Sequence, residues 1–278
     1  MPRIETRLID IDGTVLIGAG KPFVLIAGPC VIESHKLCRQ ICAEVLSITR
    51  HLGIPYIFKA SFDKANRTSG ASFRGDGMEA GLDILAAIKS EFGIPVLTDV
   101  HQADQCKAVA SVVDIIQIPA FLCRQTDLLL AAGETNCVVN IKKGQFMAPE
   151  DIAQAVRKVE STGNQRVMVT ERGVSFGYHN LVVDFRSLPQ MAAAGGVPVV
   201  FDATHAVQQP AAQGHATGGT REYVPHLAKA AVAVGIDALF LEVHPEPKNA
   251  LSDAATVLDL ADLPHLLQVL KAIETAVS

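Results

Sequence analysis

Apolar residues along this chain come in short runs, and each run ends in polar or charged residues. Eight runs have the length and the branched side chains of buried strands, at 23–28, 54–60, 95–100, 114–118, 137–142, 166–171, 197–202 and 237–243. Segments with helical spacing lie between them, at 35–51, 78–92, 103–111, 124–133, 149–162, 186–194, 222–235 and 262–276. This alternation predicts an α/β protein with a closed (β/α)8 TIM barrel, and a doubly wound sheet is the alternative. No linker or low-complexity block interrupts the pattern, so we expect a single domain over residues 1–278.

The first 22 residues precede this pattern and contain a turn signal. Asp12 and Gly13 lie between the apolar groups 8–11 and 15–17, which predicts an N-terminal β-hairpin that caps the barrel floor. The same stretch, DIDGT (10–14), also matches the nucleophile motif of haloacid-dehalogenase-type phosphatases. That motif needs a strand followed by a helix in a doubly wound domain, whereas a second strand follows here. The hairpin is therefore favoured over the phosphatase.

Composition and charge narrow the class of protein. The chain has 278 residues, 49% of them hydrophobic, and its net charge is −5 with a pI near 6.0. An acidic protein of this kind is not expected to bind nucleic acid or an anionic membrane. The start lacks the apolar core of a secretory signal and no run could span a bilayer, so a cytoplasmic location is expected. Six cysteines without CxxC spacing are expected to be reduced, mostly core thiols.

Polar side chains follow all eight predicted strands, and in a barrel the carboxyl ends of the strands carry the active site. These ends hold Cys30, the segment 59–69, Asp99 with His101, Gln117, Lys142 with Lys143, Glu171 with Arg172, Asp202 with His205, and Glu242 with His244. The segment KASFDKANRTS (59–69) is the densest, with three cations and three hydroxyls in eleven residues. A large charged active site is therefore predicted.

Some of these strand ends suggest a metal site. Cys30, His205 and Glu242 follow the first, seventh and eighth strands, which become neighbours when the barrel closes, and Asp253 lies in the next loop. A thiolate, an imidazole and two carboxylates suit a divalent ion such as Zn²⁺, Fe²⁺, Mn²⁺ or Co²⁺, although a core cysteine and a hydrogen-bonded histidine remain the alternative.

Five cations also converge on the mouth of the predicted barrel: Lys59, Lys64, Arg67, Lys142 and Arg172. A single phosphate needs about one arginine and a few donors, so five cations predict several anionic groups unless acidic neighbours pair with them. The glycine-rich loop 210–221 after the seventh strand is expected to act as a lid or phosphate loop.

Nine segments, in order along the chain, resemble those of one family. They are IAGPCVIES (26–34), FKASFDKANRTS (58–69), TDVH (98–101), DIIQIPAFLCRQTDLL (114–129), NIKKGQF (140–146), TERG (170–173), FGYHNLVVDFRSLP (176–189), DATHAVQ (202–208) and EVHPEP…LSDA (242–254). The family is the 3-deoxy-D-manno-octulosonate-8-phosphate synthases. The resemblance implies a homotetrameric (β/α)8 barrel that converts phosphoenolpyruvate, D-arabinose 5-phosphate and water into the eight-carbon keto acid phosphate and inorganic phosphate. In Gram-negative bacteria this product feeds lipopolysaccharide synthesis.

The resemblance also implies roles for individual residues. The phosphoenolpyruvate pocket would consist of Lys59, Ser61, Lys64, Gln117, Lys142 and Arg172. The arabinose 5-phosphate contacts would be Asn66, Arg67, Thr68 and a neighbouring subunit's Arg124. The catalytic residues would be Lys64, Lys142, His205 and Asp253. The metal-dependent branch of the family has Cys at the position of Cys30, where the metal-independent branch has Asn. Cys30, His205, Glu242 and Asp253 all match the metal-dependent pattern. Thr68 departs from the expected Ser, which puts its phosphate contact in doubt.

Two rival enzymes have sequence features of their own. The sibling 3-deoxy-D-arabino-heptulosonate-7-phosphate synthases, which use erythrose 4-phosphate, resemble KPRTS where this chain has Lys64-Ala65-Asn66-Arg67. An amide at Asn66 can hydrogen-bond a sugar hydroxyl and a proline side chain cannot, which favours the arabinose substrate. A Schiff-base aldolase that uses Lys142 and no metal is the rival from another class.

Overall fold

The computed structural model describes residues 4–65, 73–210 and 218–277. Within them, eight parallel strands pair in sequence order, and β11 also pairs with β14 to close the barrel. The strands are β3 (Val24–Gly28), β4 (Tyr56–Lys59), β5 (Val96–Asp99), β6 (Ile115–Ile118), β7 (Val138–Lys142), β8 (Val167–Glu171), β11 (Val199–Asp202) and β14 (Ala238–His244). The predicted (β/α)8 barrel is confirmed, and the doubly wound alternative is wrong.

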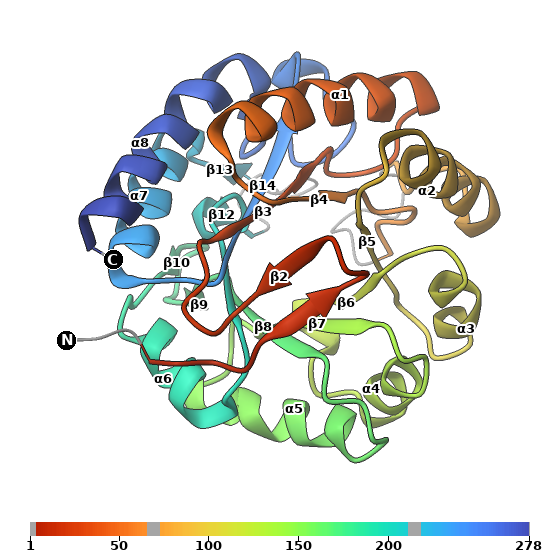
Figure 1. The fold of residues 1–278 in the computed structure, drawn as a ribbon, viewed down its shortest axis with the longest axis vertical. Coiled ribbons are helices and arrows are strands. Elements are labelled where there is room, and N and C mark those ends of the chain that lie inside the picture. Colours follow the sequence, from red (N-terminus) through yellow and green to blue (C-terminus); the bar gives the residue numbers. More distant parts are fainter. Residues whose placement is uncertain (1–3, 66–72, 211–217, 278) are drawn as a thin grey trace.

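A helix follows each barrel strand, and the helices form a ring around the strands (Figure 1). They are α1 (His35–Leu52), α2 (Met78–Phe92), α3 (Gln105–Ala110), α4 (Thr126–Gly133), α5 (Ile152–Glu160), α6 (Ser187–Gly195), α7 (Val224–Val234) and α8 (Leu263–Val277). Short 3-10 turns lie at Ala120–Leu122, Pro149–Asp151, His205–Val207, Arg221–Tyr223, Pro247–Asn249 and Leu260–Asp262. The remaining short strands are β9 (Val174–Ser175) paired with β10 (Leu181–Val182), β12 (Gln208–Gln209) paired with β13 (Gly218–Gly219), and β15 (Leu258–Asp259) beside β14. All eight strands and all eight helices lie within a few residues of the ranges predicted from the sequence.

The first helix shows how local sequence sets the boundaries. The hydroxyl of Ser34 accepts a hydrogen bond from the backbone N–H of Leu37 at 3.1 Å and so caps α1. Gly53 ends the same helix in the left-handed conformation with φ of 65°, which glycine adopts without a steric cost. Glycine is also required at the end of β3, because a Cβ on Gly28 would lie 1.9 Å from the carbonyl oxygen of Lys59. Strands β3 and β4 therefore approach each other closely at the carboxyl end of the barrel, where the side chain of Lys59 points inward.

The N-terminal residues form the predicted hairpin. Strands β1 (Ile9–Ile11) and β2 (Val15–Ile17) pair through a turn at Asp12 and Gly13, both with positive φ, and the side chain of Asp10 accepts from the backbone N–H of Gly13. Apolar side chains of the hairpin join the lower core of the barrel, and Figure 1 shows the hairpin lying across one end of the ring. The motif DIDGT therefore belongs to a β-turn, and the structural context of a phosphatase nucleophile is absent from the described residues.

The inside of the barrel changes from apolar to polar along each strand. Inward positions near the floor are apolar: Ile26, Ile57, Leu97, Ile115, Val138, Met168, Val200 and Phe240. Because side chains in a strand alternate between two faces, the next inward position is two residues further on. Those positions hold Gly28, Lys59, Asp99, Gln117, Asn140, Thr170, Asp202 and Glu242. The alternation thus delivers polar groups to the carboxyl end of the barrel. No helix among the described residues is long and apolar enough to cross a membrane.

Candidate active site

A pocket of about 140 Å³ opens at the carboxyl ends of the strands. Its walls come from every part of the barrel: Lys59, Ser61, Lys64, Asp99, Gln117, Pro119, Ala120, Phe121, Lys142, Gln145, Arg172, His205, Gln208, Pro210, Glu242 and Asp253. Nine of the residues proposed from the sequence are in this set. The residues that the sequence places far apart are therefore brought together.

Two of the cations lie against one buried carboxylate. Lys59 Nζ is 2.7 Å from Glu242 Oε1 and also donates to the carbonyl oxygen of Cys30. Lys64 Nζ lies 3.9 Å from the same carboxylate oxygen and 2.9 Å from the hydroxyl of Ser61. Burial alone would raise the pKa of Glu242, but Lys59, His205 and Lys64 lower it to about 2. Glu242 is therefore an ionised carboxylate inside the barrel.

Lys142 projects from the end of β7 over an aromatic floor. Its Nζ lies 4.0 Å from the centre of the Phe240 ring and 2.5 Å from Oδ2 of Asp202, which is completely buried. Burial lowers the pKa of Lys142, and the carboxylate of Asp202 partly opposes that shift. For Asp202, burial is outweighed by His205 and Lys142, so its pKa is held below the usual range. The side chain of Lys142 is thus held as an ion pair at the bottom of the pocket.

The side chain of Arg172, just after β8, is linked to Asp253 by Gln208. One of its terminal nitrogens donates to the side-chain oxygen of Gln208 at 2.6 Å and to the carbonyl oxygen of His205 at 3.0 Å. The amide nitrogen of Gln208 donates to Asp253 Oδ2 at 3.1 Å. The buried Nε of Arg172 has no hydrogen-bond partner among the described residues, so this N–H is a donor that an anion in the pocket can use.

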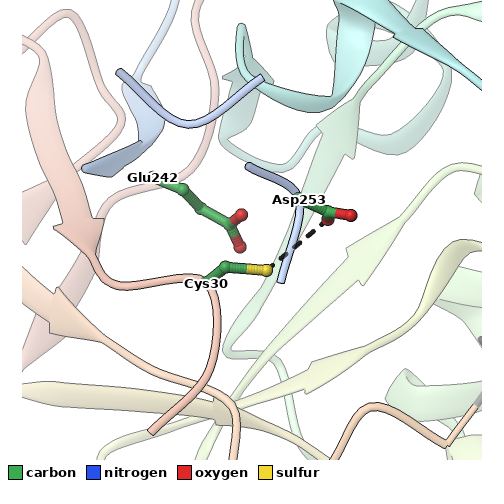
Figure 2. A group of neighbouring side chains, drawn as sticks. All are labelled: Cys30, Glu242 and Asp253. Carbon is green, nitrogen blue, oxygen red and sulfur yellow. Dashed lines mark hydrogen bonds between the residues drawn. The ribbon is translucent and has the colours of Figure 1, made fainter. Parts of the chain in front are cut away.

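The predicted metal ligands gather at one side of the pocket. Ligand atoms of Cys30, Glu242 and Asp253 all lie within 4.8 Å of one another. Figure 2 shows the thiol of Cys30 beside the carboxylate of Glu242 and joined by a hydrogen bond to Asp253. Nε2 of His205 lies 3.6 Å from Glu242 Oε2 and 3.5 Å from Asp253 Oδ2. Cys30 Sγ lies 2.7 Å from the hydroxyl of Ser252. The loop before β15 thus completes a cluster that begins on β3, β11 and β14.

The chemistry of this cluster fits a divalent cation. Oε2 of Glu242 is buried and has no hydrogen-bond partner among the described residues, which is costly unless something binds it. Burial, with smaller effects of Asp253 and Glu242, raises the pKa of the Cys30 thiol, and Lys64 and Lys59 partly oppose that shift. Asp253 has a positive φ of 49°, an uncommon conformation for a residue other than glycine that is often found at binding sites. One sulfur, one imidazole nitrogen and two carboxylates form a donor set for a borderline metal ion.

The chain is similar to known proteins along almost its whole length. The family model described as "DAHP synthetase I family" matches residues 6–278. The chain is 57% identical over 270 residues to the 2-dehydro-3-deoxyphosphooctonate aldolase of Cyanothece sp., covering 97% of this chain and 98% of that protein. It is 56% identical to the protein of the same name from Geobacter sulfurreducens (98% and 99% covered) and 56% identical to that from Granulibacter bethesdensis (96% and 94% covered). The chain belongs to the DAHP synthetase I family. The family resemblance drawn from nine sequence segments is confirmed.

Some predicted residues of this DAHP synthetase I family member lie outside the pocket or outside the described residues. Arg124 is exposed and lines a separate surface pocket with Phe146 and Lys158. The prediction that Arg124 opens the following helix is wrong, because α4 begins at Thr126 and Arg124 lies in the turn before it. Asn66, Arg67 and Thr68 lie outside the described residues, as does most of the predicted lid at 210–221.

Several residues of the site were given no role from the sequence, although Asp202 was named among the polar strand ends. Gln208 joins Arg172 to Asp253, and Asp202 contacts both Lys142 and His205. Asn140 donates to the side chain of Gln117 and accepts from Thr170, forming a buried polar layer beneath the pocket. Asp202 and Asn140 stand at inward positions of their strands, and this alternation was the signal available in the sequence. Gln208 lies in the two-residue strand β12, which is too short to show such a periodicity.

Proposed function

We propose that this chain is a 3-deoxy-D-manno-octulosonate-8-phosphate synthase, which condenses phosphoenolpyruvate with D-arabinose 5-phosphate and water and releases inorganic phosphate. The observation that carries the proposal is the convergence of Lys59, Lys64, Lys142 and Arg172 on one pocket beside a cluster of metal-binding donors. Relatives named 2-dehydro-3-deoxyphosphooctonate aldolase match 95–98% of the chain at 53–57% identity.

The charge of the pocket suits these substrates. Each phosphate carries about −1.5 to −2 near neutral pH, so phosphoenolpyruvate with its carboxylate and the sugar phosphate together bring about four to five negative charges. Lys59 and Lys142 are paired with Glu242 and Asp202, whereas Arg172 keeps a buried N–H without a partner among the described residues. Arg172 is therefore assigned to an anionic group of phosphoenolpyruvate, with Lys142, Lys64, Ser61 and Gln117 around the same ligand.

The bonds formed and broken follow from the substrates. C3 of phosphoenolpyruvate attacks the aldehyde carbon of arabinose 5-phosphate, and the aldehyde oxygen takes up a proton. Water adds its oxygen to C2, and phosphate leaves by cleavage of the C2–O bond, so that a keto acid remains. Lys142 and Arg172 hold the phosphate and the carboxylate, so the protein contributes mainly orientation and charge stabilisation.

The metal-dependent branch of the family is the second part of the proposal. Cys30, His205, Glu242 and Asp253 would hold one Zn²⁺, Fe²⁺, Mn²⁺ or Co²⁺ ion, as supported by their mutual distances and by the unpartnered oxygen of Glu242. When bound, such an ion orients water or the aldehyde and polarises it as a Lewis acid.

A homotetramer is the third part of the proposal. Arg124 is exposed and does not line the central pocket, so its guanidinium is available to a neighbouring subunit. A bidentate guanidinium suits the terminal phosphate of arabinose 5-phosphate. In this assembly each site would be completed by an arginine from the next chain.

Substrate discrimination tests the main proposal. The purified protein is incubated with phosphoenolpyruvate and either arabinose 5-phosphate or erythrose 4-phosphate, with and without added metal, and the keto acid and phosphate are measured. We expect product with the arabinose ester only; equal or better use of erythrose 4-phosphate would assign the chain to the sibling synthases.

The Schiff-base aldolase is tested in parallel, because Lys142 is buried with a lowered pKa, as reactive lysines are. Borohydride in the presence of either substrate should leave no adduct on Lys142, since its ammonium is paired with Asp202. A reduced adduct that maps to Lys142 would replace the proposed mechanism.

A further inference from the structure

We propose that Asp202 is a positioning residue that fixes the proton of His205 on Nδ1. This leaves the lone pair on Nε2, the ring atom nearest the carboxylates of Glu242 and Asp253, where it can bind a metal ion. The inference rests on the proposed metal site, of which His205 is a member. Asp202 is the last residue of β11 and is completely buried. It does not line the pocket, so it acts through its neighbours and does not touch substrate.

Both oxygens of the Asp202 carboxylate contact His205. Oδ1 accepts a hydrogen bond from the backbone N–H of His205 at 2.9 Å, and Oδ2 lies 2.7 Å from Nδ1 of the ring. Oδ2 also lies 2.5 Å from Nζ of Lys142, and Nζ is 3.5 Å from Nδ1. One carboxylate therefore holds the main chain and the ring of His205, together with the ammonium of Lys142.

These contacts decide which ring nitrogen carries the proton. A carboxylate only accepts, so Nδ1, which lies 2.7 Å from Oδ2, must carry the proton that it donates. The ammonium of Lys142 only donates, and its close contact is with the same Oδ2 at 2.5 Å, whereas Nδ1 is 3.5 Å away. In a neutral ring the lone pair is then on Nε2, the atom that lies 3.5–3.6 Å from the carboxylates of Asp253 and Glu242. An acidic partner on the far nitrogen is the usual way in which proteins orient a metal-binding histidine.

Two simpler roles for Asp202 must be separated from this one. It could only fix the turn through the backbone N–H of His205, or it could only be the counter-ion of Lys142. Asp202→Asn retains the oxygen that accepts from the backbone but places an NH₂ donor opposite Nδ1, which favours the other tautomer with the proton on Nε2. Lys142→Met removes the ion pair and leaves the Asp202–His205 hydrogen bond in place.

Metal affinity measured with Zn²⁺ alone is the first test. Competition with a chelator is used on the full-length wild type, Asp202→Asn and Lys142→Met. Asp202→Asn should weaken Zn²⁺ binding by about 10- to 100-fold, the usual effect of removing such a partner. Lys142→Met should bind Zn²⁺ at least as tightly as the wild type, because a nearby positive charge is lost. Unchanged affinity in Asp202→Asn, or an equal loss in Lys142→Met, would overturn the proposal.

The tautomer is the second test and needs neither metal nor activity. Metal-free protein labelled with ¹⁵N-histidine is examined by NMR at a pH where the ring is neutral, and His205 is assigned with His205→Gln. We expect Nδ1–H in the wild type and in Lys142→Met, and Nε2–H in Asp202→Asn. An Nε2–H ring in the wild type refutes the proposal, even if Asp202→Asn does not fold. If the wild type binds no Zn²⁺, the proposed metal site fails, whereas the tautomers still decide the role of Asp202.

Discussion

Nζ of Lys59 lies 2.7 Å from Oε1 of Glu242, and the two side chains are 1% and 0% exposed. Two inward positions that are 183 residues apart in sequence thus form one buried ion pair in the wall of the pocket. Breaking such a pair leaves a buried charge without its partner, which typically costs about 3–5 kcal/mol. We predict that Lys59→Met lowers the free energy of unfolding of the metal-free protein by about this amount, as measured by urea denaturation with chelator present. Lys64→Met is the control, because Lys64 is partly exposed and 3.9 Å from Glu242, and it should cost less than half as much.

Removal of Cys30 should remove the metal without unfolding the barrel. Residues that only hydrogen-bond to a metal ligand change metal affinity by about 10- to 100-fold. Loss of a ligand itself, as in Cys30→Ala, should therefore weaken metal binding by more than about 100-fold. Metal content after dialysis and activity with added Mn²⁺, Fe²⁺ or Zn²⁺ are measured together with circular dichroism. Cys38→Ala is the matched control, because Cys38 is a buried thiol of helix α1 that is not among the proposed ligands. Full activity of exhaustively chelated wild type would rule out a catalytic metal.

The oxygen of released phosphate reports which bond breaks. In ¹⁸O-labelled water, cleavage of the C2–O bond leaves all four oxygens of the phosphate from phosphoenolpyruvate, so mass spectrometry should find unlabelled phosphate. A phosphatase acting on phosphoenolpyruvate in the same water serves as the control and should give labelled phosphate. Label in the phosphate released by this protein would mean that water attacks phosphorus.

Replacement of Arg124 should affect one substrate more than the other. A hydrogen-bonded charge contributes about 1.5–3 kcal/mol, so Arg124→Ala should raise KM for arabinose 5-phosphate by about 10- to 150-fold and leave KM for phosphoenolpyruvate within a few-fold. Arg157→Ala, an exposed arginine on α5, is the matched control and should change neither value.

Mixed assemblies test whether Arg124 acts across subunits. Arg124→Ala and His205→Ala chains, each nearly inactive alone, are co-assembled. Some hybrid sites would combine an intact His205 with an intact Arg124 from the neighbour, so activity should exceed that of both parents. Hybrids with no gain would restrict Arg124 to its own subunit or exclude it from the site.

Buried thiols should make the fold sensitive to alkaline pH. Burial, with a smaller effect of Glu33, raises the pKa of Cys38 to about 12, and burial with the neighbouring Cys38 raises that of Cys42 to about 12. Between the ordinary thiol pKa near 9 and these values, the unfolded chain has lost protons that the folded chain retains, so stability falls as pH rises. At pH 10.5 each thiol should account for about 2 kcal/mol of lost stability. Urea denaturation at pH 8 and 10.5 checks this, and Cys38→Ala should show a shallower pH dependence than the wild type.

The sequence by itself determined the order and nature of the elements and the chemical character of the site. Runs such as 95–100 and 114–118 are short and mostly apolar, which favours a buried parallel strand, and Asp12-Gly13 favours a tight turn. Once a run is recognised as a strand, the sequence also shows which polar residue stands at its carboxyl end. Nine of the proposed site residues were therefore found before any contact was known.

Only the tertiary structure decided which of these groups pair with one another. Barrel closure brings β14 beside β3 and β11, so Glu242 on β14 meets His205, which follows β11, and Lys59, which reaches it from β4 on the far side of β3. Distances between residues more than 30 positions apart depend on register and loop geometry, which leave no periodic signal in the sequence. For that reason the bridging role of Gln208 and the contact of Asp202 with Lys142 were missed. The sequence determined which residue types stand at the strand ends, and closure of the barrel determined which of them contact each other.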